Sequence, residues 1–214
     1  IKTGMLATAD IVNAVADALA SPACAGVSVV VDPVMVSTSG HSLLATDAVD
    51  AYISRLLPAA TLLTPNIQET LLLLSSAAKG QQEVIDDIAS MERAARSLAA
   101  MGPAYVLIKG GHLANSGASD GDEAPTAVDV LCERATGKCT HFSAALTPKT
   151  SHTHGTGCTL ASAVAAALAK GASVPEAVAQ AKSYVAGAIA NSTHLALGTG
   201  MQGPMNHHWE QVDW

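Results

Sequence analysis

The sequence has few basic residues and gathers none of them into a run. Its 214 residues contain 11 lysines and arginines against 18 aspartates and glutamates, and the formal net charge is −7. A protein that binds nucleic acid or an anionic membrane through its surface charge carries a basic patch, so this balance argues against both kinds of partner. Any phosphate group that the protein binds must therefore be held by a local site.

Long apolar runs and paired cysteines are missing as well. No stretch reaches the roughly 18 apolar residues that cross a bilayer, and the first residues lack the charged and apolar order of a secretion signal. The four cysteines are Cys24, Cys132, Cys139 and Cys158, and none forms a C-x-x-C pair. This spacing indicates reduced thiols. We expect a globular protein that is cytoplasmic, or organellar if a targeting segment has been lost.

Three common nucleotide-binding or kinase motifs are also absent. The sequence has no P-loop pattern G-x-x-x-x-G-K-[ST], no H-R-D sequence of the protein kinases and no Rossmann pattern G-x-G-x-x-G. If the chain transfers phosphoryl groups, it does so with a different arrangement of residues.

Strand and helix signals alternate along almost the whole chain. This alternation predicts one α/β domain over residues 1–214, with a mostly parallel sheet covered by helices on both faces. The apolar spacing and the capping residues predict helices over residues 9–20, 46–57, 69–74 and 84–101, and a last long helix that Ser173 caps. Buried strands are predicted over residues 27–31, 60–63 and 105–108, and two antiparallel strands over 127–132 and 139–142.

The most informative segment is His154-Gly155-Thr156-Gly157-Cys158-Thr159, which leads directly into an alanine-rich helix. Glycines let backbone N–H groups approach a ligand, and the first turn of a helix offers unpaired N–H donors at the positive end of the helix dipole. The segment therefore predicts a phosphate site in which the thiolate of Cys158 is favoured. The alternative is a tight loop with a small buried side chain.

Polar residues stand at the carboxyl ends of several predicted strands. Asp32, Asn66 and Lys109 each follow a strand, and in a parallel sheet these ends meet at the ligand-binding edge. Lys109 could reach a phosphate, whereas Asp32 and Glu69 could hold Mg²⁺. Taken singly, each residue also has an ordinary interpretation, as a surface lysine, a turn-forming aspartate or a favourable charge in a first helical turn.

Four motifs together resemble a known family. Asp32-Pro33-Val34-Met35, Thr64-Pro65-Asn66 with Glu69, Lys109-Gly110-Gly111-His112 and the glycine segment occur in the order and spacing of the hydroxymethylpyrimidine/phosphomethylpyrimidine kinases of thiamine biosynthesis, in the ribokinase superfamily. The resemblance covers essentially the whole chain. It implies a ribokinase-like three-layer α/β/α sandwich that phosphorylates 4-amino-5-hydroxymethyl-2-methylpyrimidine with ATP, and then phosphorylates the monophosphate to the diphosphate.

The resemblance also implies cofactors, a partner and site residues. The cofactors are ATP and Mg²⁺, and the expected assembly is a homodimer. The implied residues are Cys158, Gly155 and Gly157 for catalysis and the anion hole, Lys109, Asn66 and Thr156 for ATP, Met5 and Val34 for the pyrimidine, and Asp32 and Glu69 for the metal.

One departure from the family leaves alternatives open. Family members begin with a further segment that contains a G-x-D-x-S-G-G-A-G stretch, which is not found here, so we expect an N-terminally truncated domain with an unpaired sheet edge. The alternatives are a pyridoxal or hydroxyethylthiazole kinase of the same superfamily, or a nucleotide-binding fragment without turnover. A zinc site is a further possibility, with His152, His154, Cys158, His207 and His208 as candidate ligands.

Overall fold

The computed structural model describes residues 1–35, 46–77, 84–111, 126–146, 153–195 and 203–210. A six-stranded sheet in the order β1-β2-β3-β4-β5-β6 forms its centre. Strands β1 (Lys2–Thr3), β2 (Val30–Val31), β3 (Leu62–Leu63) and β4 (Tyr105–Ile108) are parallel, whereas β5 (Thr126–Glu133) and β6 (Cys139–Ala145) are antiparallel to their neighbours. Within the described residues, β1 pairs on one side only.

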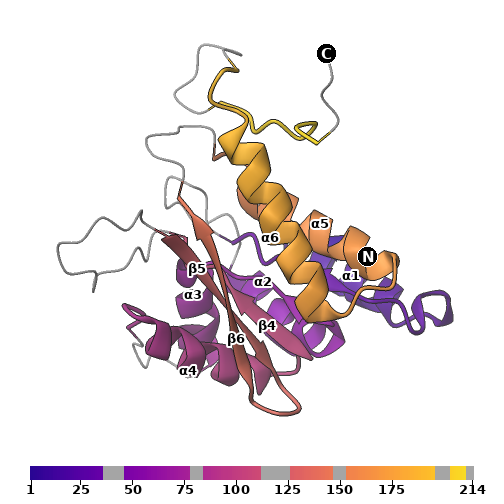
Figure 1. Cartoon of the computed structure of the whole chain (residues 1–214). Helices are drawn as coiled ribbons and strands as arrows, with labels where there is room; N and C mark the ends of the chain where they lie inside the picture. The colour runs from indigo at the N-terminus through magenta and orange to yellow at the C-terminus, as the bar shows by residue number, and fades with distance from the viewer. Residues whose placement is uncertain (36–45, 78–83, 112–125, 147–152, 196–202, 211–214) are drawn as a thin grey trace.

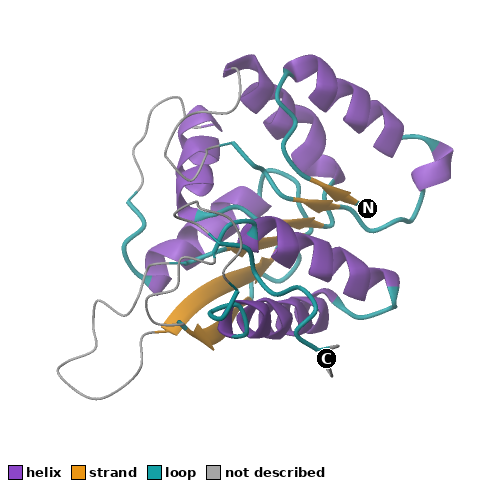
Figure 2. Ribbon diagram, turned by 90° about the horizontal axis from the view of Figure 1, so that it is seen from above, coloured by secondary structure: helices purple, strands orange, loops and turns teal. Residues whose placement is uncertain are grey.

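Helices connect the strands and cover both faces of the sheet (Figures 1 and 2). The α-helices are α1 (Ala9–Leu19), α2 (Thr46–Ala51), α3 (Ile67–Ala77), α4 (Ile88–Ala99), α5 (Thr156–Ala169) and α6 (Val174–Ala190). Short turns of other helix types are η1 (Pro22–Cys24), η2 (Tyr52–Leu56) and η3 (Leu57–Ala59). No helix among the described residues combines the length and the apolar character needed to span a membrane.

The alternation of side chains along the strands divides the core into two layers. Val30, Leu62 and Leu107 point to one face, where they pack against α5 and α6. Their neighbours Val31 and Leu63, and strand residues of β4 and β5, point to the other face and pack against α1 to α4. Figure 1 shows α3 and α4 on the side of the sheet opposite to α5 and α6. The α/β/α arrangement predicted from the sequence is confirmed.

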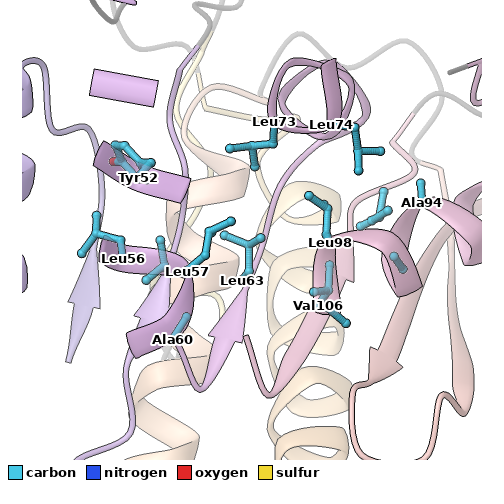
Figure 3. Close-up of a cluster of buried hydrophobic side chains, with 14 of the residues drawn as sticks. Tyr52, Leu56, Leu57, Ala60, Leu63, Leu73, Leu74, Ala94, Leu98 and Val106 are labelled. Atoms are coloured by element: carbon cyan, nitrogen blue, oxygen red, sulfur yellow. The ribbon is translucent and has the colours of Figure 1, made fainter. Parts of the chain in front are cut away.

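Leucines dominate the layer that covers the second face (Figure 3). Leu56, Leu57, Leu63, Leu73 and Leu98 have no exposed surface in this layer. Such a core fixes the positions of the strand ends, because a close-packed interior leaves little room for the strands to shift.

Most predicted elements are present, but several bounds differ for local reasons. The predicted helix over residues 84–101 begins only at Ile88, because the Asp87 carboxylate accepts the Ser90 N–H at 2.6 Å and caps the helix there. The predicted strand over residues 27–31 is reduced to Val30–Val31. The N–H of Val29 donates to the Thr61 hydroxyl rather than to a strand, at 2.9 Å.

The helix predicted over residues 46–57 is also less regular than expected. It is α-helical only to Ala51, and it continues as the π-helical turn η2 and the 3₁₀ turn η3 before Ala60. In contrast, the short helix expected over residues 69–74 extends to Ile67–Ala77, because Asn66 caps it. The capping box that Ser173 and Glu176 form confirms the predicted start of the last helix.

Replacing Leu63 by alanine should lower the free energy of unfolding by about 2–5 kcal/mol, because it leaves a cavity in a fully buried layer. Denaturant unfolding followed by circular dichroism measures the change. Val84→Ala is the control, since Val84 is 72% exposed and its truncation should change stability by less than about 0.5 kcal/mol. Equal losses from the two variants would contradict the described core.

Candidate active site

The polar residues predicted to meet at the sheet edge do meet there. Asp32 follows β2 and Lys109 follows β4, and each lies two positions after a strand residue, Val30 or Leu107, that faces α5 and α6. The period of two along a strand therefore turns both side chains toward the start of α5. This arrangement places a carboxylate and an ammonium group on the same face, with the glycine segment above them.

Asp32 is the centre of this cluster and is only 1% exposed. Its Oδ1 accepts hydrogen bonds from Lys109 Nζ at 3.0 Å and from the Thr64 hydroxyl at 3.2 Å. Lys2 Nζ lies 3.5 Å from its Oδ2, although the geometry is not that of a hydrogen bond. Two cations thus neutralise one buried carboxylate, which agrees with the rule that buried charges are paired.

Lys2 was not predicted as a site residue. A lysine beside the first two-residue strand has no motif to mark it, and its parallel pairing opposite Val30 becomes visible only in the sheet. The sequence does offer one signal, because Lys2 stands two residues before Gly4 among residues that are apolar or neutral. Lys2 and Lys109 thus bring two positive charges to this end of the sheet, beside the carboxylates of Asp32 and Glu69.

Asn66 and Glu69 form a reciprocal cap at the start of α3. The Asn66 N–H donates to Glu69 Oε2 and the Glu69 N–H donates to Asn66 Oδ1, both at 2.8 Å. Glu69 is 3% exposed, and burial raises its pKa above the ordinary value. The nearby charge of Lys109 and hydrogen bonds from the backbone at Asn66 and Met35 act in the opposite direction. The carboxylate is thus already engaged by the backbone.

Lys109 bridges the cluster to the glycine segment. A Cβ placed on Gly157 would lie 3.1 Å from Lys109 Nζ, so the ammonium group reaches the first turn of α5. Gly155 precedes this turn with φ 82°, a left-handed conformation that favours glycine, and no side chain caps the helix. The predicted combination of helix N-terminus, glycines and lysine is therefore present.

Cys158 lies in the first turn of α5 and its side chain is exposed. It stands at one end of an open groove of about 890 Å³ between α5 and α6. Thr159 and Ser162 line the groove on α5, whereas Tyr184 and His207 line it from the other side. The groove begins at the first turn of α5, and its volume exceeds that of a phosphate group.

The segment 203–210 contributes His207 and Glu210 to the lining of this groove. Tyr184 OH donates to the carbonyl of His207 at 2.6 Å, and Trp209 Nε1 donates to the carbonyl of Tyr184 at 3.1 Å. Thr159 Oγ1 donates to the Gly155 carbonyl and lies 3.1 Å from His207 Nε2. If the hydroxyl proton points to the Gly155 carbonyl, His207 Nε2 is the donor of that contact.

Met5 and Val34, predicted to line the substrate pocket, follow β1 and β2 and lie at the same sheet edge as Asp32. Met5 is 55% exposed and Val34 is partly buried. The loop that carries Met5 is held by Tyr52, whose hydroxyl donates to the Gly4 carbonyl at 3.1 Å. Burial raises the pKa of Tyr52, so this donor stays protonated.

The donor set can be tested against Mg²⁺. Asp32 Oδ2 is buried and accepts no hydrogen bond. The hydroxyl oxygen of Thr3, the last residue of β1, is likewise buried without a hydrogen-bond partner. Among the described residues, no group of three or more histidine, cysteine or acidic side chains could hold a metal ion, which leaves the predicted zinc alternative without support there. Mg²⁺ keeps several waters and needs only one or two carboxylates when substrate phosphates are also ligands, so Asp32 fits this cation.

Comparison with known proteins agrees with these observations. The family model described as phosphomethylpyrimidine kinase matches residues 1–206. The hydroxymethylpyrimidine/phosphomethylpyrimidine kinase of Streptomyces coelicolor is 46% identical over 209 residues, which cover 98% of this chain and 68% of that protein. The chloroplastic thiamine biosynthetic bifunctional enzyme TH1 of Arabidopsis thaliana is 43% identical over 97% of this chain and 36% of its own length.

Solved structures show the same relationship. The pyridoxal kinase of Staphylococcus aureus in complex with ADP has a TM-score of 0.78 at 33% identity, covering 99% of this chain and 68% of that one. The phosphomethylpyrimidine kinase of Clostridium difficile has a TM-score of 0.64 at 32% identity, covering 86% and 66%. The chain thus spans about two thirds of these relatives and about one third of the bifunctional plant enzyme.

Replacing Glu69 by glutamine should change how stability depends on pH. Because burial raises the pKa of Glu69 in the folded chain, the folded state binds the proton more tightly than the unfolded state, whose ordinary value is 4.5. Ionisation therefore costs stability as the pH rises through the interval between the two values. Glutamine does not ionise and still offers an acceptor to the Asn66 N–H.

We therefore expect the free energy of unfolding of the wild type, relative to Glu69→Gln, to fall as the pH rises above 4.5 and then to level off. Urea unfolding in magnesium-free buffer at a series of pH values measures it. Parallel pH curves for the two proteins would show that Glu69 is not held in a buried environment.

Proposed function

The chain belongs to the phosphomethylpyrimidine kinase family and has its ribokinase-like fold, and from this premise we propose that it transfers the γ-phosphoryl group of ATP to a pyrimidine alcohol. The substrate is 4-amino-5-hydroxymethyl-2-methylpyrimidine, and a second transfer converts its monophosphate to the diphosphate. The observation that carries the proposal is the position of Lys109 Nζ, which donates to Asp32 and lies 3.1 Å from where a Cβ on Gly157 would be, in the first turn of α5.

This contact supports phosphoryl transfer because the reaction depends on positioning and on neutralising charge. The N–H groups at the start of α5, next to the left-handed Gly155, would receive the oxygens of the transferring group. Lys109 adds a positive charge at 3.1 Å from the Cβ position of Gly157. When bound, Mg²⁺ would neutralise charge on the phosphate oxygens, and Asp32, directly or through water, would hold it with Glu69 contributing charge.

In the transfer step, the hydroxymethyl oxygen attacks the γ-phosphorus, the bond to the β–γ bridging oxygen breaks and ADP leaves. The hydroxyl proton must go to a base. Cys158 lies in the first helical turn beside the anion site and is exposed to an incoming alcohol. Its thiolate therefore either accepts the proton or aligns the hydroxyl group. Met5 and Val34, at the ends of β1 and β2, would border the ring.

The groove between α5 and α6 supports a nucleotide as phosphate donor. It starts at Cys158 and Thr159, so a nucleotide with its terminal phosphate at the anion site can extend along the groove. Small side chains such as Ala163 and Ala166 line it and leave space for a flat base, with Tyr184 and His207 at the sides. Asn66 at the strand ends and Thr156 at the start of α5 would contact the phosphates.

A second candidate is phosphorylation of pyridoxal. Pyridoxal kinases of Staphylococcus aureus and Bacillus subtilis match the chain with TM-scores of 0.78 and 0.77, above the 0.64 of the Clostridium difficile phosphomethylpyrimidine kinase. Pyridoxal also presents a hydroxymethyl group on a heteroaromatic ring, so the same transfer would apply. The sequence relatives favour the pyrimidine, since the Streptomyces coelicolor protein reaches 46% identity.

A direct test incubates the chain with Mg-ATP and, separately, the hydroxymethylpyrimidine, its monophosphate, pyridoxal and hydroxyethylthiazole, and follows product masses. Two successive gains of a phosphate on the pyrimidine would support the proposal. Turnover of pyridoxal alone would support the second candidate. Bound ATP with no product from any alcohol would mean that this chain alone is a nucleotide-binding unit without turnover.

Replacing Cys158 by alanine should lower turnover by about 10²–10⁴-fold, the range typical of a group that handles the proton. The ATP dissociation constant should change by less than about threefold, because the backbone donors remain. Cys24→Ala is the matched control, since Cys24 is half-buried in η1 and far from the groove residues in sequence. Unchanged turnover in the Cys158 variant would remove the residue from the mechanism.

Replacing Gly155 by alanine should weaken ATP binding through the backbone alone. Gly155 has φ 82°, and a Cβ there meets no atom within 4 Å, so only the left-handed conformation is penalised, by about 1–2 kcal/mol. Gly26 has φ 76° and equally open surroundings, which makes Gly26→Ala the control. Both variants should lose similar stability, but only Gly155→Ala should lose ATP affinity in calorimetry. If Gly155→Ala bound ATP as tightly as Gly26→Ala, this result would contradict the anion site.

A further inference from the structure

We propose that Asp129 and Lys182, which lie outside the motifs used so far, act as a positioning pair for Lys109. The inference rests on the proposed function, because it assigns Lys109 to the nucleotide phosphates. Lys182 comes from α6 and fixes the carboxylate of Asp129 on β5. That carboxylate holds the N–H of Gly110, the residue that follows Lys109, and so fixes the direction in which Lys109 leaves the sheet.

The contacts that make up the pair are short and buried. Lys182 Nζ donates to Asp129 Oδ2 at 2.6 Å, and the Gly110 N–H donates to Asp129 Oδ1 at 3.0 Å. The two charged residues are 9% and 7% exposed. Each carboxylate oxygen thus has its own donor, and the carboxylate cannot turn without breaking one of the two contacts.

The pair acts at the point where β4 leaves the sheet. The ladder between β4 and β5 ends at Ile108 and Val130, so Lys109 and Gly110 have no ladder partner on β5. On the other side, the Lys109 N–H donates to the Pro65 carbonyl at 2.9 Å. The Asp129 side chain supplies the missing contact on the β5 side, and Lys109 is therefore fixed from both neighbouring strands.

Gly110 is suited to this close approach. A Cβ at this position would collide with the Val128 carbonyl oxygen, and it would lie 3.2 Å from Met91 Cε. Only glycine lets the chain pass so near to β5, where the Asp129 carboxylate can reach its N–H. The glycine after Lys109 thus has a packing reason in addition to the freedom that a phosphate loop needs.

An ion pair at this place is not explained by stability. Removing two charges from water costs several kcal/mol per ion, and apolar side chains of similar volume often stabilise a protein as well or better. A buried pair that spans two elements does fix their relative position. Here it joins α6, whose Ala181, Ser183 and Tyr184 line the groove, to the strand end that carries Lys109. The pair therefore couples the groove wall to the phosphate-contacting lysine.

Two double variants that remove both charges distinguish loss of the hydrogen-bond acceptor from loss of the charges. D129N/K182Q keeps an oxygen for the Gly110 N–H, and the two amides can bond to each other. D129L/K182M has similar side-chain volumes but no acceptor. Amide exchange of Gly110 is measured by NMR in the ligand-free chain, acylation of Lys109 by mass spectrometry, and binding of Mg-ADP by calorimetry.

We expect D129L/K182M to exchange the Gly110 amide about tenfold faster than the wild type, and to bind Mg-ADP about tenfold more weakly, as loss of one buried hydrogen bond implies. Its Lys109, 15% exposed in the wild type, should react faster with the acylating reagent. D129N/K182Q should stay within about threefold of the wild type in all three measurements. The melting temperatures show whether both variants are folded.

Equal Gly110 exchange and equal Mg-ADP affinity in the two double variants would overturn the proposal. If D129L/K182M does not fold, the wild type still decides: a Gly110 amide that exchanges at the rate of an unstructured peptide would contradict the Asp129 contact. Wild-type protein that binds no Mg-ADP would count against the proposed function, whereas Gly110 exchange and Lys109 acylation would still test the positioning pair.

Discussion

The hydrogen-bonded ion pair between Lys109 and Asp32 is the contact on which the rest of the site depends. It joins the ends of β2 and β4 across β3, at the edge where the sheet meets the start of α5. A free lysine would lie in solvent and a free aspartate would be a costly buried charge. Together they hold one ammonium group 3.1 Å from where a Cβ on Gly157 would be, and the proposed anion site acquires a cation fixed by the core.

Local rules predicted the parts of this arrangement that repeat along the chain. The alternation of strands and helices gave the three layers, and the residues after each strand gave Asp32, Asn66 and Lys109, because parallel strands end at one edge. The glycine segment was recognisable because left-handed glycine, helix start and cysteine are neighbours in sequence. The roles of these residues in binding and catalysis remain predictions that the experiments above address.

Non-local contacts could not be predicted in this way. Lys2 reaches Asp32 through strand pairing, Lys182 reaches Asp129 over 53 positions, and His207 reaches Thr159 over 48. No spacing rule connects such partners before the sheet order is known. Helix bounds were missed for a different reason, since single capping side chains such as Asp87 outweigh the apolar pattern that surrounds them.

The fold alone does not decide the substrate, because pyridoxal kinases and a phosphomethylpyrimidine kinase both match the chain in structure at similar sequence identity. The proposed function depends instead on nucleotide phosphates binding at the start of α5. A crystal structure of the chain with Mg²⁺ and a non-hydrolysable ATP analogue tests it most directly. We predict the terminal phosphate at the N–H groups of Gly157 and Cys158, within hydrogen-bonding distance of Lys109. A nucleotide bound elsewhere, with Lys109 still turned only to Asp32, would contradict it.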